Sequence, residues 1–208
     1  MSSTSTFPSL SDPAAWWRRL CWIGDGRIAV SGDLSVDPEQ ARTQLEAWRD
    51  AGITHVVDLR EEWTDETFVA THAPEITYHW IGTHDAGGHQ DRAWFDAGVA
   101  AILAALTDPD ARVVVHCHMG VNRAPSMALA ALLALGVDPV AALDEIRTAR
   151  PIAYIAYAES AVLWWHFACD LPVTTTIDAV TAVRAWHHDN PCDVGWIISR
   201  IRRAEDDG

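Results

Sequence analysis

The chain has 208 residues, of which 49% are hydrophobic and 21% are charged, as is typical of one globular domain with a substantial core. Its formal net charge is −14, because it has 29 acidic residues but only 15 arginines and no lysine. Such a surface repels polyanions, so neither nucleic acid nor an anionic membrane is expected as a partner.

Strands and helices are predicted to alternate along the chain. Asp12 and Asp37 each precede a proline, which indicates capped helices leading into Trp16 and running from residue 38 to about 51. Short β-branched runs predict strands at 28–31, 53–59, 76–81 and 112–116. Further helices are expected at 63–70, 91–106, from 125 onward, at 138–147 and at 154–169. The pattern predicts an α/β fold with a central, mostly parallel sheet flanked by helices.

Three regions are expected within this fold. Residues 1–26 read as an N-terminal extension with a short helix, and residues 27–170 as the main domain. Residues 171–208 read as extra C-terminal helices packed on the same domain, with helical patterning at 177–187 and 194–201. Tryptophans on apolar helical patterns are expected in the core, namely Trp164, Trp165, Trp186 and Trp196.

The four cysteines, at positions 21, 117, 169 and 192, lack the paired short spacings of a zinc site. The N-terminus lacks the pattern of a secretory signal, and the longest apolar run, 124–137, is too short to span a bilayer. These features predict a soluble, cytoplasmic protein without a metal.

The most informative segment is 116–126, which reads His-Cys-His-Met-Gly-Val-Asn-Arg-Ala-Pro-Ser. It joins a predicted buried strand to a predicted helix, with Gly120 allowing a tight turn. Free backbone N–H groups and the positive end of the helix would form a cradle for a phosphate-sized anion. The guanidinium of Arg123 could bind two oxygens of this anion at once. In the same electrostatic field, Cys117 is expected to be an exposed thiolate, and peroxide is expected to inactivate the protein reversibly by oxidising it.

This segment is similar to the His-Cys-x5-Arg signature of the cysteine-dependent protein phosphatases of the dual-specificity type. Weaker similarities at 28–34, 52–60 and 146–151 extend the resemblance over about residues 27–168. The resemblance implies hydrolysis of phosphate monoesters through a phosphocysteine, with no cofactor. It makes Cys117 the nucleophile, Arg123 the phosphate clamp and Asp85, in the predicted loop 82–90, the general acid and base.

Asp91 competes with Asp85 for this role, but it is the better candidate for the N-cap of the next helix. His84 and His89 flank the loop and could relay protons or contact substrate. Gly87 and Gly88 would let the loop close over a substrate.

The resemblance also assigns roles within the signature segment. The residues expected to bind substrate are His118, Met119, Gly120, Val121 and Asn122. His116 is expected to support the loop by hydrogen bonds between its ring and nearby backbone, and Ser126 is a second supporting residue. His118 could also supply a titrating positive charge at the rim of the pocket. Many relatives carry Ser or Thr where this chain has Ala124, so slow turnover is a possible consequence.

Inositol-phosphate phosphatases that resemble this family usually carry lysines inside the loop. Because this chain has no lysine and a strong negative charge, the resemblance disfavours highly phosphorylated inositols, phosphoinositides and RNA 5′ ends as substrates. Phosphotyrosine or phosphoserine/threonine in proteins is the expected substrate, and phosphate or sulfate is expected to occupy the loop. Three alternatives stay open: a phosphate-binding module without catalysis, a glucan or small-molecule phosphatase, and a sulfurtransferase of the rhodanese type. An acid at Asp85 argues against the first and the last, because neither needs to protonate a leaving group.

Overall fold

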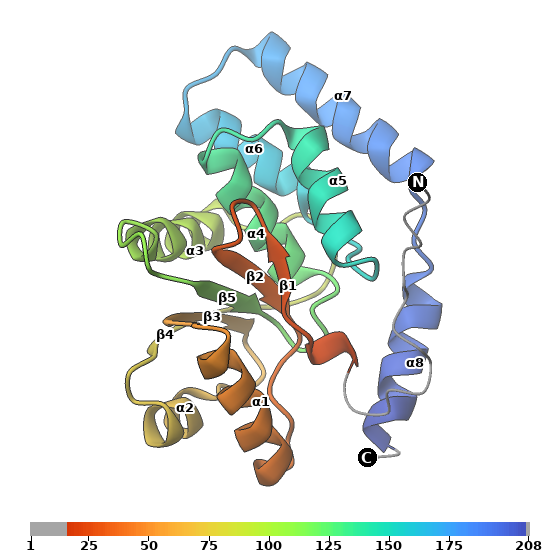
Figure 1. Cartoon of the computed structure of the whole chain (residues 1–208). Helices are drawn as coiled ribbons and strands as arrows, with labels where there is room; N and C mark the ends of the chain where they lie inside the picture. Colours follow the sequence, from red (N-terminus) through yellow and green to blue (C-terminus); the bar gives the residue numbers. More distant parts are fainter. Residues whose placement is uncertain (1–15, 207–208) are drawn as a thin grey trace, which may run out of the picture.

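The computed structural model describes residues 16–206, so the predicted helix start at Asp12 and the segment 1–10 lie outside the described residues. A single sheet forms the centre of the fold, and helices cover both of its faces (Figure 1). The five strands are β1 (Cys21–Ile23), β2 (Ile28–Ser31), β3 (His55–Arg60), β4 (Thr77–Thr83) and β5 (Val113–His116).

The sheet has the order β1-β2-β5-β3-β4, in which β2, β5, β3 and β4 are parallel and only β1 runs antiparallel to its neighbour. The expected α/β fold with a mostly parallel sheet is confirmed. All four residues of β5 are buried, because helices cover this central strand on both faces. Burial on both faces explains its continuous run of β-branched residues.

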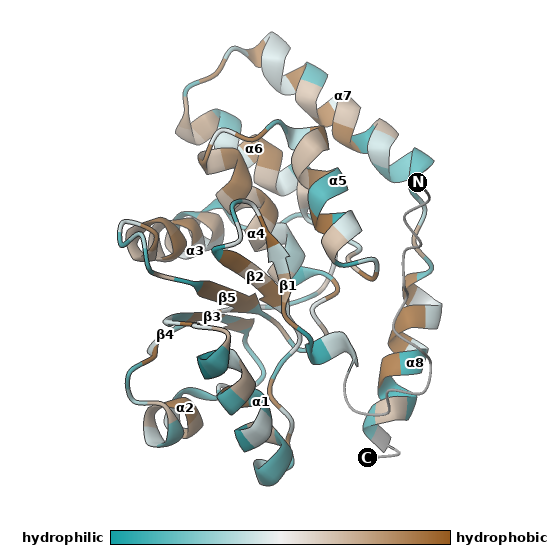
Figure 2. Ribbon diagram, in the orientation of Figure 1, coloured by the Kyte–Doolittle hydropathy of each residue, from teal (hydrophilic) through white to brown (hydrophobic). Residues whose placement is uncertain are grey.

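The helices form a layer on each side of the sheet. A short 3-10 helix, η1 (Trp16–Arg18), precedes the sheet, and α1 (Pro38–Asp50) and α2 (Glu66–His72) cover one face. The other face is covered by α3 (Arg92–Ala105), α4 (Arg123–Ala134), α5 (Pro139–Ala149) and α6 (Ala158–Ala168). Every residue of α4 from Arg123 to Leu133 is buried, which matches its hydrophobic colouring in Figure 2. A helix that is apolar all round belongs in the middle of a fold.

Aspartates at N-cap positions mark where three of these helices begin. The carboxylates of Asp37, Asp91 and Asp138 each accept backbone N–H groups at the start of α1, α3 and α5. The prediction of a helix over 154–169 was partly wrong, because α6 begins only at Ala158. Ile155 has a positive φ of 61°, and its N–H donates to the carbonyl of Val121 in the signature segment. A residue in that left-handed conformation does not fit inside an α-helix, so α6 can begin only after Ile155.

Two further helices follow α6. Val183 and Trp186 of α7 (Val173–Asp189) join the main core, and α7 packs on α6 and α5. The last helix, α8 (Val194–Asp206), packs Ile197 and Ile201 against Trp17 and the signature segment, beside η1 in Figure 1. The division of the chain near residue 170 stays a prediction. No helix within residues 16–206 has the length and apolar character needed to cross a membrane.

The expected burial of the tryptophans holds only in part. Trp164 and Trp186 are buried and Trp165 is half-buried, but Trp196 is 55% exposed. Its position in the core was wrongly predicted, because α8 packs on the fold through Ile197 and Ile201 and turns Trp196 to the outside.

Candidate active site

The signature loop, residues 117–122, connects the end of β5 to the start of α4. Within residues 16–206, no hydrogen-bond acceptor pairs with the backbone N–H groups of His118 through Ala124. Asn122, the N-cap residue of α4, makes no side-chain capping bond, so the first turn of this buried helix keeps its free donors. Unpaired N–H groups at the positive end of a helix are suited to hold an oxyanion.

The carbonyl side of the same loop is held by Arg150, which is buried. Its guanidinium donates to the carbonyls of Gly120 at 2.6 Å and of Met119 at 3.1 Å, and also to the carbonyl of Trp17. Gly120 itself has φ of +61°, a conformation that favours glycine. Because Arg150 satisfies these carbonyls, the loop is held in shape while its N–H groups stay available to a ligand.

Arg123 is buried at the entrance to α4, and Glu62 holds it from the loop after β3. The Nη1 and Nη2 atoms of Arg123 donate to the two carboxylate oxygens of Glu62 at 2.8 and 2.9 Å. Nη1 also donates to the carbonyl of Thr83 at 3.0 Å. Its Nε is buried and has no hydrogen-bond partner among the described residues. The Nε–H of Arg123 is therefore left as a hydrogen-bond donor inside the site.

Burial and charge act in opposite directions on this pair. Burial favours the neutral form of Arg123, but the hydrogen bonds that it donates to Glu62 and the negative charge at Cys117 and Asp85 raise its pKa overall. Burial likewise raises the pKa of Glu62, and the hydrogen bonds from Arg123 outweigh it, so the pKa of Glu62 is lowered. Both groups are charged near neutral pH.

Cys117 lies directly after the central strand and is only 2% exposed. The expectation of an exposed thiolate was therefore wrong, because the strand end and the signature loop enclose the side chain. One side of Cys117 packs against the main core, and a negative charge on its sulfur would favour the charged form of Arg123. The cysteine and the arginine thus belong to one buried site.

Asp85 lies in the loop between β4 and α3 and reaches the signature loop, as the sequence predicted. Its Oδ1 accepts from Asn122 Nδ2 at 2.6 Å and from the hydroxyl of Tyr157 at 2.8 Å. Its Oδ2 lies 3.4 Å from the free Nε of Arg123. Asp91, the competing acid, caps α3 by accepting the N–H of Ala93. The fold therefore brings Asp85 to Arg123 and the signature loop and leaves Asp91 to the helix.

His116 differs from expectation. Its ring is completely buried, and neither nitrogen has a hydrogen-bond partner among the described residues. The predicted ring-to-backbone bonds are therefore wrong. The ring packs on Trp48, with centroids 5.6 Å apart, and its Nε2 lies 3.8 Å from Asp58. Burial lowers the pKa of His116, so the neutral ring supports the strand end by packing.

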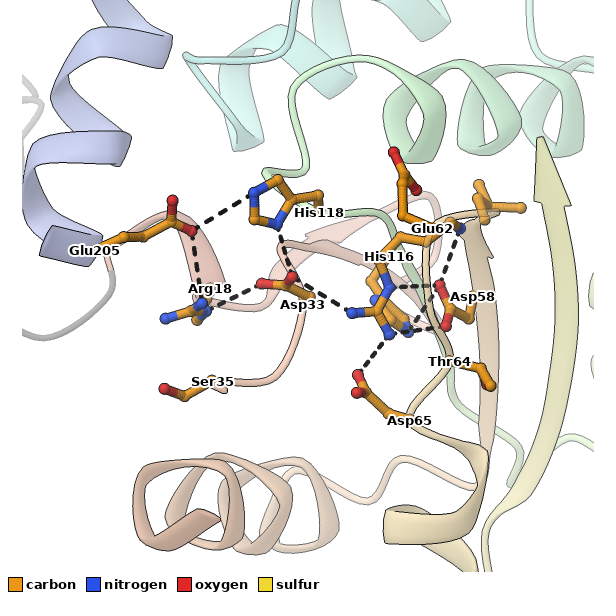
Figure 3. Close-up of polar contacts among 12 residues, drawn as sticks. Arg18, Asp33, Ser35, Asp58, Glu62, Thr64, Asp65, His116, His118 and Glu205 are labelled. Carbon is orange, nitrogen blue, oxygen red and sulfur yellow. Dashed lines mark hydrogen bonds and ion pairs between the residues drawn. The ribbon is translucent and has the colours of Figure 1, made fainter. Parts of the chain in front are cut away.

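His118 faces carboxylates on both sides of its ring (Figure 3). Its Nδ1 is 2.7 Å from Asp33 Oδ2, and its Nε2 is 3.7 Å from Glu205 of α8. The hydrogen bond to Asp33 raises the pKa of His118, although burial opposes it. The titrating charge predicted from the sequence is present, but its ring nitrogens are taken by protein carboxylates. The ring of His118 is thus engaged within the protein, and its role in substrate binding stays a prediction.

An ionic network continues from Asp33 beneath the loop. Arg60 is fully buried and pairs with Asp58 through two bonds of 2.9 and 2.8 Å. It also reaches Asp65 at 2.6 Å and Asp33 at 3.4 Å. Asp58 and Arg60 are two residues apart on β3, so their side chains lie on the same face of the strand. The network links the carboxyl end of β3 to Asp33, which in turn bonds to His118 of the signature loop.

The remaining predicted residues lie around the site. Ser126 Oγ accepts the N–H of Tyr157 at 3.3 Å, which joins α4 to the segment before α6. His89 Nδ1 is 3.1 Å from Ser160, and His84 pairs with Glu61 on the surface. Both histidines lie on the loop between β4 and α3, here called the acid loop, and among the described residues their rings bond to Ser160 and Glu61 rather than to the signature loop.

Asp33, His118 and Glu205 place possible ligand atoms within 4.8 Å of one another. However, Arg18 donates to Asp33 at 3.2 Å and lies 3.7 Å from Glu205, so a guanidinium already supplies positive charge to both carboxylates. The trio is an ion-pair cluster, and we assign no metal to it.

Sequence reasoning missed Glu62, Tyr157, Arg150 and Asp33 as parts of the site. Glu62 lies three residues beyond the carboxyl end of the predicted strand 53–59, a position that could have marked it. Arg150 belonged to the segments that carried the resemblance, but nothing local indicated that it binds loop carbonyls. Tyr157 had no signal, because its partner Asp85 is distant in sequence.

Known proteins are similar to this chain in sequence. The chain is 33% identical to dual specificity protein phosphatase 26 of Bos taurus over 97 residues, which cover 47% of this chain and 46% of that protein. The Homo sapiens protein of the same name is 30% identical over the same length. The chain thus spans about half the length of the curated relatives it matches.

Solved structures agree on the fold. Human DUSP28 superposes with a TM-score of 0.58 at 19% identity, covering 73% of this chain and 95% of that one. Tk-PTP in its active form gives 0.54 at 21% identity, covering 71% and 94%. The family model described as "Dual specificity phosphatase, catalytic domain" matches residues 38–152, a range that contains the signature loop, Arg123 and Asp85. The chain therefore belongs to the dual specificity phosphatase family.

Proposed function

We propose that this protein hydrolyses phosphate monoesters through a phosphocysteine formed on Cys117. The observation that carries the proposal is the signature loop, whose N–H groups from His118 to Ala124 have no acceptor within residues 16–206. The free Nε of Arg123 adds a charged donor to the same cradle. Together they can neutralise the oxygens of a phosphoryl group during transfer.

The proposed reaction has two steps. The Cys117 thiolate attacks phosphorus, the bond to the leaving oxygen breaks, and Asp85 gives that oxygen a proton. Water then attacks the phosphocysteine, Asp85 takes a proton from it, and the phosphorus–sulfur bond breaks to release phosphate. Ala124 offers no hydroxyl to stabilise the departing sulfur, so we expect slow turnover in the second step.

Phosphotyrosine, or another aryl phosphate, is the substrate that we favour, with phosphoserine/threonine next. Trp63 is 40% exposed, and its ring lies 5.2 Å from that of His118 at the edge of the signature loop. An aromatic face in that position could stack on an aromatic leaving group. The same face would also suit a sugar, which keeps a glucan phosphatase as the second candidate.

Hydrolysis of p-nitrophenyl phosphate in the presence of a chelator tests the activity. We expect Cys117→Ser to abolish it, whereas Cys169→Ser, at an exposed cysteine, leaves it intact. Asp85→Asn should slow it by on the order of 100-fold or more, as loss of a general acid does. Asp91→Asn removes a carboxylate that only caps α3 and is the matched control.

The rival functions give different results. An intact, reduced protein that binds phosphate without turnover would indicate a binding module. Production of thiocyanate from thiosulfate and cyanide would indicate a sulfurtransferase. Parallel assays with phosphopeptides and phosphorylated glucan would separate the two candidate substrate classes.

A further inference from the structure

The hydroxyl of Tyr157 joins the acid loop to the core of the domain. It donates to Asp85 Oδ1 at 2.8 Å and accepts the N–H of Gly87 at 3.1 Å. Tyr157 is 1% exposed and precedes α6 as its N-cap residue. One buried phenol therefore contacts both the carboxylate and the backbone of the loop that carries it.

The position of Tyr157 is itself fixed by the surrounding structure. Its N–H donates to Ser126 Oγ on the buried helix α4, and its ring makes an edge contact with Trp94 of α3 at 6.3 Å. The acid loop has little packing of its own, since Gly87 and Gly88 are exposed and an added Cβ at either would meet nothing within 4 Å. Tyr157 thus supplies the loop with an anchor on a rigid part of the fold.

Asn122 completes the arrangement from the signature loop. Its Nδ2 donates to Asp85 Oδ1 at 2.6 Å, and its Oδ1 accepts the N–H of Ala156 at 2.7 Å. Asp85 Oδ1 therefore receives two hydrogen bonds, while among residues 16–206 its Oδ2 has only the 3.4 Å contact with Arg123 Nε. A carboxylic acid carries its proton on one oxygen and accepts on the other. Two donors at Oδ1 make it the accepting oxygen and leave the proton to Oδ2.

We propose that Tyr157 is a positioning residue that, with Asn122, orients Asp85 so that the transferable proton sits on Oδ2, facing the phosphate cradle. The inference rests on the proposed function, because it assigns how the general acid of that reaction is held. Tyr157 itself does not touch the reacting atoms.

The state of the phenol supports this role. Burial raises the pKa of Tyr157, and the hydrogen bond to Asp85 raises it further. The hydroxyl consequently stays protonated across the neutral range and remains a donor to Asp85. A tyrosinate would instead repel the carboxylate.

The test compares leaving groups in the full chain. p-Nitrophenolate departs without needing much protonation, whereas phenol and especially an alkyl alcohol depend on the general acid. Rates on p-nitrophenyl, phenyl and alkyl phosphates are measured for wild type, Tyr157→Phe, Asp85→Asn and Tyr154→Phe. Tyr154 is a partly exposed tyrosine whose ring faces His187 on α7, so Tyr154→Phe is the matched control.

We expect Tyr157→Phe to lose only a few-fold on p-nitrophenyl phosphate but on the order of 10- to 100-fold on phenyl and alkyl phosphates, a fraction of a full general-acid effect. Asp85→Asn should show the same trend more steeply, and Tyr154→Phe should match wild type. Thermal unfolding of Tyr157→Phe checks that the fold is retained, and the substitution keeps the buried ring.

Two outcomes overturn the inference alone: no loss in Tyr157→Phe, or an equal loss on all leaving groups beside a steep trend in Asp85→Asn. The second would mean that the hydroxyl only stabilises the fold. A wild-type protein without esterase activity, or an active Cys117→Ser variant, would overturn the proposed function and this inference with it.

Discussion

Gly120→Ala tests the shape of the signature loop most directly. Gly120 has φ of +61°, and a Cβ there would lie 2.5 Å from the carbonyl oxygen of Ser31 and would also collide with Arg150. Ser31 is on β2, next to β5, so it cannot move without disturbing the sheet. Both the backbone conformation and the close approach therefore oppose any side chain at this position.

The two effects can be given magnitudes. An L-residue in the left-handed region costs about 1–2 kcal/mol. Forcing extra atoms into a packed interior costs about 1–3 kcal/mol more. We expect Gly120→Ala to lower the free energy of unfolding by about 2–5 kcal/mol, with a loss of phosphate binding because the loop must shift.

Gly136→Ala is the matched control. Gly136 follows the other end of α4, has φ of +88° and has nothing within 4 Å of an added Cβ, so only the backbone cost applies. Urea denaturation of both variants, with and without inorganic phosphate, gives the comparison. If the two variants lost the same stability, the close approach of Gly120 to β2 would be refuted.

Three further predictions concern the ionic network of Figure 3. Arg60→Met leaves the buried Asp58 without its arginine partner, so denaturation should show a loss of about 3–5 kcal/mol, and a loss below about 1 kcal/mol would contradict the buried pairing. The raised pKa of His118 adds stability that is complete below its unfolded pKa of about 6.5 and disappears as the pH rises through the folded pKa. The stability difference between wild type and His118→Gln should therefore shrink as the pH rises above about 6.5 and through the higher pKa of the folded protein, and a constant difference would exclude this linkage. Glu205→Gln should lower the pKa of His118 in an NMR titration, since Glu205 contributes to raising it; an unchanged titration would mean that α8 does not act on the loop.

Predictions that depended on neighbouring residues agree well with the structure. Asp37, Asp91 and Asp138 cap helices as their spacing indicated, and β2 spans the predicted residues. The errors arose where distant contacts override local pattern. Ile155 bends the chain toward Val121, which delays α6, and the packing of α8 exposes Trp196.

The amino-acid sequence by itself determined the segment that joins a buried strand to a helix, with Cys117 and Arg123 at its two ends. Strand, turn and helix are local structures, so a few adjacent residues are enough to specify them. The tertiary structure alone decided that Glu62 holds Arg123, that Arg150 binds the loop carbonyls, and that Tyr157 anchors Asp85. These partners are far apart along the chain, and only strand order and helix packing bring them together.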